Sequence, residues 1–194
     1  MQSVLPCRQG IKWYCEHPGC LVTEETRRCP YCPDGHRLSV YAWYWRWSAV
    51  PEAEAVRIKV ARLRCTRVGR TVSLLPDFCL PRRIIGPAIL ARFLMALVTT
   101  RLSLGAALEA AWQVGAARTT AESLLRGFLA RAPLIATFLA TMSVSTPPPL
   151  LAALPNRAPL ALLVRGLLSD AMSETEAFVQ HARQFHVQHH LGLI

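Results

Sequence analysis

The clearest pattern in this chain alternates with a period of two and predicts a β-hairpin. Over 41–47, one set of alternate positions is Tyr41, Trp43, Trp45 and Trp47, and the other is Ala42, Tyr44 and Arg46. Over 56–60 apolar residues alternate with basic ones, and both patterns are expected of strands whose successive side chains point to opposite faces. Pro51 lies between them in an acidic turn. The alternation changes phase after Ala61, which predicts a bulge near Val60 and Ala61. We expect the Trp-rich face to be the core of a small sheet, with a base-stacking platform as the alternative.

After residue 80 the apolar residues recur at helical spacing. The period predicts a first helix over about 87–99, a second that begins after the capping residue Ser103, and a third that begins near Thr119. The third begins with the sequence of a capping box, Thr119 to Glu122. Gly115 separates the second helix from the third, so the pair is a candidate helix-turn-helix, with an ordinary three-helix bundle as the alternative.

The last part of the chain begins with a Pro-rich stretch and ends in one predicted helix over about 160–184. We expect this helix to dock on the preceding bundle or to pair with a second copy of the chain. Histidines gather near its end, at His181, His186, His189 and His190. We expect them to lie in a solvated tail rather than to bind a metal.

Composition and charge indicate an anionic partner. The 194 residues are 52% hydrophobic and 18% charged, which excludes a chain that is disordered throughout. The net charge is +10, and all the basic residues except Lys12 and Lys59 are arginine. Because arginine binds phosphate bidentately and stacks on aromatic faces, nucleic acid is the first expectation, and a coding bias toward arginine is the alternative.

The apolar segments do not predict membrane insertion or export. No run of about 18 uninterrupted apolar residues is present, and the segment Met1–Gly10 lacks the apolar core of a signal peptide. We therefore expect a cytoplasmic protein without a membrane partner. In that compartment, clustered cysteines are typical of metal ligands rather than of disulfides.

The spacing of the cysteines indicates a zinc ribbon that lacks one ligand. Cys29 and Cys32 place two thiolates on a tight turn, which supplies one edge of a zinc tetrahedron. Cys65 ends the second strand, where the opposite knuckle of a ribbon belongs, but Val68 stands where the last ligand is expected. Buried, reduced cysteines are the alternative interpretation.

Two sets of ligands remain open. The first combines Cys29, Cys32 and Cys65 with a fourth ligand borrowed from Cys20, Cys79 or His36. The second is Cys15, Cys20, Cys29 and Cys32, with Cys65 as a buried thiol and His17 as a spare ligand. We slightly favour the second set, because its four thiolates are close in sequence and need no substitution. In either set the predicted cofactor is structural Zn²⁺, since a small sheet buries too little surface to be stable alone.

The basic and polar residues near the third helix are the predicted DNA contacts. The N-terminus of a helix carries a partial positive charge that favours phosphate, and arginines clustered beside it strengthen the prediction. The predicted contacts are Arg82, Arg83, Arg118, Thr119, Thr120, Ser123 and Arg126.

Composition also divides the chain into four parts. Residues 1–80 contain all seven cysteines and are predicted to form a zinc-ribbon-like module, followed by a helix-turn-helix bundle over 82–142. A Pro-rich linker over 143–159 and a C-terminal helix and tail over 160–194 complete the chain. The predicted fold class is α+β: a small N-terminal zinc-ribbon-like β-hairpin module, then an all-α helix-turn-helix bundle and a C-terminal helix.

Several motifs together resemble a known family. They are Cys29-Pro-x-Cys32, Gly35-His-Arg-Leu38, Trp43-Tyr-Trp-Arg46, Arg62-x-Arg-Cys65 and Gly69-Arg-Thr-Val-Ser-Leu-Leu-Pro-Asp-Phe78. Over roughly residues 15–130 the chain is similar to an uncharacterised bacterial family that couples a zinc ribbon to a helix-turn-helix. This family in turn resembles the N-terminal DNA-reading region of insertion-sequence transposases. The resemblance implies mobile-element DNA binding, and Val68 departs from it, because the family has its fourth cysteine there.

The sequence therefore predicts a zinc-containing protein that binds double-stranded DNA and is related to transposases. A transposase nuclease domain needs three separated carboxylates to hold two metal ions. With 12 acidic residues and no strand pattern after residue 80, the chain is not expected to be an enzyme. The alternatives are a protein-interaction adaptor for a transposase or a second copy of the chain, a vestigial transposase fragment, and an RNA-binding ribbon.

Overall fold

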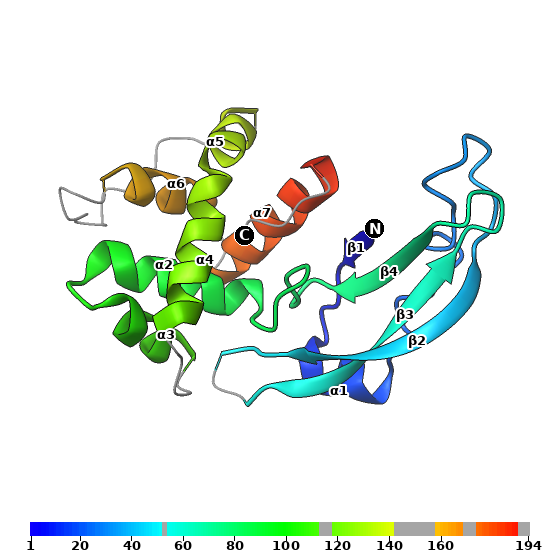
Figure 1. The fold of residues 1–194 in the computed structure, drawn as a ribbon, viewed down its shortest axis with the longest axis horizontal. Coiled ribbons are helices and arrows are strands. Elements are labelled where there is room, and N and C mark those ends of the chain that lie inside the picture. The colour runs from blue at the N-terminus through cyan, green and yellow to red at the C-terminus, as the bar shows by residue number, and fades with distance from the viewer. Residues whose placement is uncertain (52–53, 113–117, 142–157, 169–173, 190–194) are drawn as a thin grey trace.

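The computed structural model describes residues 1–51, 54–112, 118–141, 158–168 and 174–189. Within these ranges the fold is α+β, with a mixed sheet at one end of the molecule and a group of helices at the other (Figure 1). The strands are β1 (Gln2–Leu5), β2 (Ser39–Ser48), β3 (Val56–Arg64) and β4 (Thr71–Pro76). The helices are α1 (Gly10–Glu16), α2 (Pro87–Thr99), α3 (Leu104–Trp112), α4 (Arg118–Ala130), α5 (Ala132–Thr141), α6 (Ala158–Leu168) and α7 (Glu174–His189).

The predicted hairpin forms the long part of the sheet. The strand order is β1-β4-β3-β2, in which β1 and β4 are parallel and the other pairs are antiparallel. Two tryptophans of β2 pair with basic residues of β3, Trp45 with Lys59 and Trp47 with Arg57. The predicted bulge lies on the partner strand instead, since the register shifts between Val40 and Ala42.

The prediction that the Trp-rich face is the sheet core is wrong. Helix α1 packs on the opposite face, where Tyr14 is fully buried and its hydroxyl donates to the Lys59 carbonyl oxygen at 3.0 Å. Ile58 and Val60 are buried on that face. Trp45 is 56% exposed, because the described residues that pack on the sheet gather on the side of α1.

The helices agree with the predicted periodicity up to α4. Helix α2 has the predicted bounds, and the Ser103 hydroxyl oxygen accepts a hydrogen bond from the Ala106 backbone N–H at 3.3 Å, as a cap does. Helix α4 begins at Arg118, so Thr119 lies inside the helix rather than at its cap. The turn that contains Gly115 lies outside the described residues.

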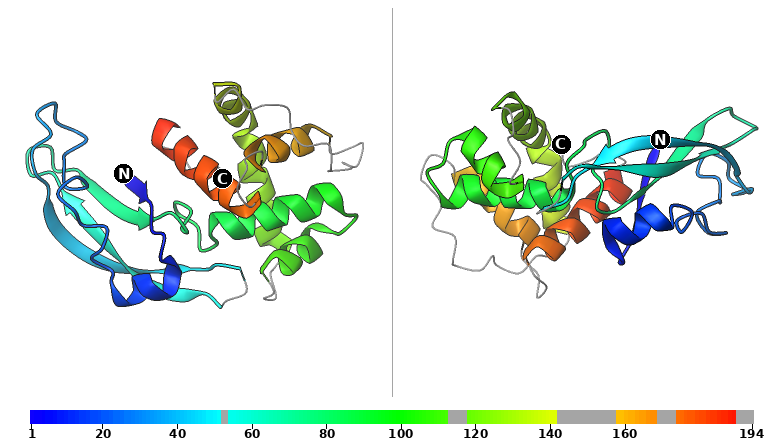
Figure 2. Two further views of the ribbon diagram at one scale, coloured as in Figure 1. Left: turned by 180° about the vertical axis from the view of Figure 1, so that it is seen from behind. Right: turned by 90° about the horizontal axis from the view of Figure 1, so that it is seen from below.

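The prediction of a single C-terminal helix is wrong. The structure has α6 and α7, and each buries its own apolar stripe against the helical core, through residues such as Val164 and Phe178. Helix α7 also contacts α2 and β1, so it lies between the sheet and the other helices (Figure 2). Each half of the predicted helix is therefore held by its own packing.

Two of the C-terminal histidines are buried, so the prediction of a solvated tail is wrong for them. His181 is 2% exposed and its Nδ1 lies 2.7 Å from the Leu167 carbonyl oxygen. His186 is 5% exposed and its Nε2 lies 2.8 Å from the Gln2 carbonyl oxygen. Both face inward because they share the side of α7 that carries Phe178 and the equally buried Phe185, while His190 lies outside the described residues.

The buried side chains form two clusters. One surrounds the sheet and α1, and the other joins α2 to α7 with Ala49, Leu80 and Ile85 from the segments beside the sheet. Among the described residues, no single helix is both long and apolar enough to cross a membrane. Helices α4 and α5 meet those criteria only when they are counted together, and they are bent by 53°.

Candidate metal centre and DNA-contacting surface

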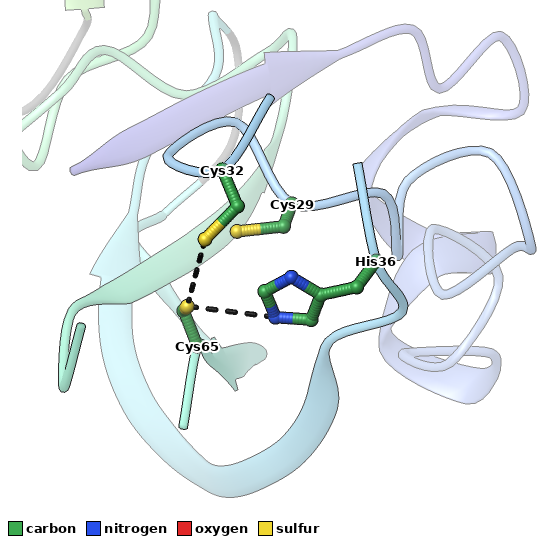
Figure 3. A group of neighbouring side chains, drawn as sticks. All are labelled: Cys29, Cys32, His36 and Cys65. Carbon is green, nitrogen blue, oxygen red and sulfur yellow. Dashed lines mark hydrogen bonds between the residues drawn. The ribbon is translucent and has the colours of Figure 1, made fainter. Parts of the chain in front are cut away.

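Three cysteines and one histidine meet beside the sheet. The thiols of Cys29, Cys32 and Cys65 and the ring of His36 point toward one another (Figure 3), and their ligand atoms all lie within 4.8 Å of one another. The two sulfurs of Cys32 and Cys65 are 3.8 Å apart, and Cys65 Sγ lies 3.5 Å from His36 Nε2.

These two separations are close to the edges of a zinc tetrahedron. With Zn–S bonds of about 2.3 Å and Zn–N bonds of about 2.0–2.1 Å, tetrahedral geometry requires about 3.8 Å between two sulfurs and about 3.5 Å between sulfur and nitrogen. The observed values match both. The group can therefore hold a metal ion, and three thiolates with one imidazole are a donor set typical of structural zinc.

The first knuckle folds around Gly35. Its φ of 55° lies in the left-handed region, which glycine adopts without the clash of a Cβ atom. The Gly35 N–H donates to the Cys32 carbonyl oxygen at 3.0 Å, and the Cys29 N–H donates to the His36 carbonyl oxygen at 2.9 Å. This tight turn directs the His36 ring toward the thiols of Cys29 and Cys32.

The second knuckle follows β3 and provides one ligand. The Cys65 N–H donates to the Arg70 carbonyl oxygen at 2.8 Å, and Gly69 has a φ of 67°. Val68 is 48% exposed, but its backbone N–H donates to the Cys65 sulfur. The turn thus keeps the form of a knuckle, and His36 is the fourth candidate ligand in place of Val68.

The thiols of the cluster differ in pKa. Burial by itself raises the pKa of Cys65, but hydrogen bonds from the Val68 backbone and from the neighbouring thiols lower it to about 7. Burial, followed by the hydrogen bonds with Cys65 and Cys29, raises the pKa of Cys32 to about 11. Cys65 is therefore thiolate in part at neutral pH, which is the form that binds metal, whereas a metal must displace the proton of Cys32.

The carboxylate of Asp34 lies beside Nδ1 of His36, whereas Nε2 of that ring lies beside the Cys65 sulfur. Asp34 Oδ1 lies 3.6 Å from His36 Nδ1, a buried atom that has no hydrogen-bond partner among the described residues. Hydrogen bonding from Arg67, at 2.5 Å from Asp34 Oδ2, lowers the pKa of Asp34 and keeps it charged. Histidines that bind metal through one nitrogen usually donate the other N–H to a carboxylate, so Asp34 is placed to orient the ring.

The other candidate ligands lie elsewhere. Cys15 is exposed on α1, and Cys20 hydrogen-bonds with Cys7, whose pKa is raised to about 11 by burial and then by Cys20. Cys79 is buried, and its sulfur lies 3.2 Å from the Ser48 hydroxyl oxygen. None of these thiols belongs to the cluster found among the described residues.

The structure thus assembles the first of the two predicted sets, with His36 as the fourth ligand. It gives no support to the slight preference for the N-terminal set that includes Cys15 and Cys20. The sequence does contain the relevant feature, because His36 directly follows the glycine that closes the first knuckle.

Five of the seven predicted DNA contacts lie together on the surface. They line a cavity of about 440 Å³ beside the first two turns of α4, together with Trp112 and neighbouring apolar residues. The five are Arg82, Arg83, Thr119, Thr120 and Ser123. Arg83 Nη1 donates to the Ser123 hydroxyl oxygen at 3.3 Å, so the segment before α2 is joined to α4.

The remaining two predicted contacts lie on α4 outside this cavity. Arg118 is exposed and pairs with Glu122 at 2.8 Å, one turn further along the helix. Arg126 is exposed two turns after Arg118. The structure therefore gathers most of the predicted set at the beginning of α4 and continues it along the helix.

Comparison of the chain with protein-family models, curated proteins and solved structures gives no match. The resemblance to a family with a zinc ribbon and a helix-turn-helix remains a prediction from the sequence motifs. The function is inferred below from the residues themselves.

Proposed function

We propose that this chain is a zinc-containing protein that binds double-stranded DNA. Structural Zn²⁺ would be held by Cys29, Cys32, His36 and Cys65, and α4 with the Arg82–Arg83 segment would contact the duplex. The proposal extends to the transposase relation that the sequence motifs imply, without a catalytic domain in this chain.

The proposed role of the metal is to fasten the knuckles to the sheet. The cluster joins the loop before β2 to the turn between β3 and β4. With four protein ligands a tetrahedral ion has no open position for a substrate, so the ion acts as a structural link. The sheet with α1 and the two knuckles is small and buries limited apolar surface, so a metal link would add to its stability.

The observation that carries the DNA-binding proposal is the gathering of five predicted contacts around one cavity at the start of α4. The first turn of a helix has unpaired N–H groups and a partial positive charge, both of which favour phosphate. Hydroxyl and guanidinium groups there supply the hydrogen bonds that fix a protein on the DNA backbone. The net charge of +10 favours the same partner.

Arg46 holds the basic segment in position. Its guanidinium group donates to the Leu80 carbonyl oxygen at 3.1 Å and to the Arg83 carbonyl oxygen. The Ala49 N–H donates to the Ile84 carbonyl oxygen at 2.8 Å. These contacts tie the segment before α2 to the end of β2, so the arginines are presented from a fixed backbone.

Binding of a random-sequence duplex by the full chain, measured by fluorescence anisotropy over a range of salt concentrations, tests the proposal. The double variant R82A/R126A removes two exposed arginines and should make the negative slope of log K against log salt shallower by about 1.8, at about 0.9 per phosphate contact. The control R8A/K12A removes two exposed charges at and just before α1 and should leave binding nearly unchanged. Equal losses in both variants, or no loss in R82A/R126A, would contradict the proposal.

A further inference from the structure

The outer face of the β2–β3 hairpin carries a row of exposed aromatic side chains. Trp43, Trp45 and Trp47 share this face because alternate residues of a strand point the same way, and Tyr41 precedes them by the same interval. Their exposed fractions are 38% for Trp43, 56% for Trp45, 50% for Trp47 and 56% for Tyr41. Contiguous apolar surface of this kind on a soluble domain marks an interaction site.

Three of the four rings in this row lie beside a cation from β3. Arg57 lies 5.5 Å from the ring centre of Trp45, and Lys59 lies 5.6 Å from that of Trp43. Arg64 lies 5.1 Å from the ring centre of Tyr41. These are cation–π distances, and neither β2 nor β3 contains an acidic residue. Within these two strands the face therefore combines flat aromatic surface with positive charge.

This combination suits an unpaired nucleic-acid strand. Bases stack on aromatic side chains regardless of sequence, and the phosphates between them pair with arginine and lysine. Alternate side chains on a strand stand about 6.8 Å apart, about twice the 3.4 Å spacing of bases along a duplex strand. A duplex keeps its bases stacked on one another, whereas a single strand can extend to meet this spacing.

We propose that this face binds single-stranded DNA, with bases on Trp43, Trp45 and Trp47 and phosphates on the cations of β3. An apolar protein partner would match the rings but leave three cations without counter-charges. The choice of DNA over RNA rests on the proposed function, in which α4 of the same chain already contacts DNA. The stacking surface itself does not depend on α4.

Anisotropy of a labelled 20-nucleotide oligothymidylate with the full chain tests this inference. The variant W45A should raise Kd by about 5- to 150-fold, the range that corresponds to loss of one stacked base. The variant W45F keeps a ring and should raise Kd by less than about threefold. Because Trp45 is exposed, both variants should keep the thermal midpoint of the parent.

Further measurements distinguish single-stranded DNA from the other ligands that this face could bind. Equal Kd values for W45A and the parent, or no binding of oligothymidylate, would overturn the proposal. So would tighter binding of oligouridylate than of oligothymidylate, or conversion of a dimer to a monomer by W45A without any effect on DNA. The variant R82A/R126A, which should bind duplex DNA more weakly, should still bind oligothymidylate. If duplex binding is absent in the parent, the proposed function fails, whereas loss of oligothymidylate binding alone contradicts this inference.

Discussion

Replacement of Arg46 by methionine tests how the basic segment before α2 is held. Methionine keeps much of the length of the side chain but removes the donors to the carbonyl oxygens of Leu80 and Arg83. A hydrogen bond from a charged donor contributes about 1.5–3 kcal/mol. Arg46 is half-buried, so water can reach part of the vacated site, and we expect a total loss of about 2–4 kcal/mol.

Urea denaturation followed by circular dichroism measures the free energy of unfolding of this variant. The control is R57M, which removes an exposed arginine of the next strand together with its contact with the Trp45 ring, worth less than about 1 kcal/mol. R46M should also weaken duplex binding, since Arg82 and Arg83 lose their fixed position. A free energy of unfolding for R46M within about 0.5 kcal/mol of the parent would refute the role of Arg46 as a clamp.

Three further predictions follow from local geometry. A Cβ atom at Gly86 would clash with the Phe78 carbonyl oxygen, whereas one at Gly19 meets nothing within 4 Å. G86A should therefore lower the free energy of unfolding by about 1–3 kcal/mol, and G19A should lower it much less. D34N removes the charged partner behind the histidine and should weaken zinc binding by about 10- to 100-fold in chelator competition; unchanged affinity would contradict that role. H36A should lose zinc, and adding V68C in the same variant should restore it, because position 68 belongs to the second knuckle. Failure of V68C to restore any zinc would show that this turn cannot supply a ligand.

The parts of the fold that depend on local periodicity were predictable from the sequence. The hairpin strands and helices α2 and α3 bury one side of a regular pattern, which a short window of sequence contains. The pairing of β1 with β4 joins residues about seventy positions apart, such as Gln2 and Ser73, and no local pattern encodes it. The division of the C-terminal region into α6 and α7 likewise depends on packing against α2.

Which face of the β2–β3 hairpin is buried could not be predicted from the residues of the hairpin itself. Both faces carry apolar side chains, with Ile58 and Val60 on one and Trp45 on the other. The outcome is decided by α1, a helix of seven residues whose Tyr14 inserts beneath β3. A short helix without a strong periodic pattern is difficult to predict. Because α1 was not predicted, the exposure of the tryptophans was not predicted either.

The metal ligands were predictable as a group but not as a final set. The spacing of Cys29 and Cys32 indicates one knuckle, and Cys65 at the end of a strand indicates the other. The choice between His36 and the N-terminal thiols depends on where α1 carries Cys15, which is toward solvent. Closeness in sequence favoured the N-terminal thiols, whereas the turn at Gly35 brings the histidine to the site.

The zinc content of purified protein, with C15S compared with C65S, tests whether the metal is held by Cys29, Cys32, His36 and Cys65. We expect one zinc ion per chain in the parent and in C15S, because Cys15 lies outside the cluster. We expect loss of zinc in C65S, because the sulfur of Cys65 forms two edges of the tetrahedron, toward Cys32 and His36. Zinc retained in C65S and lost in C15S would contradict this ligand set and place the metal at the N-terminal cysteines.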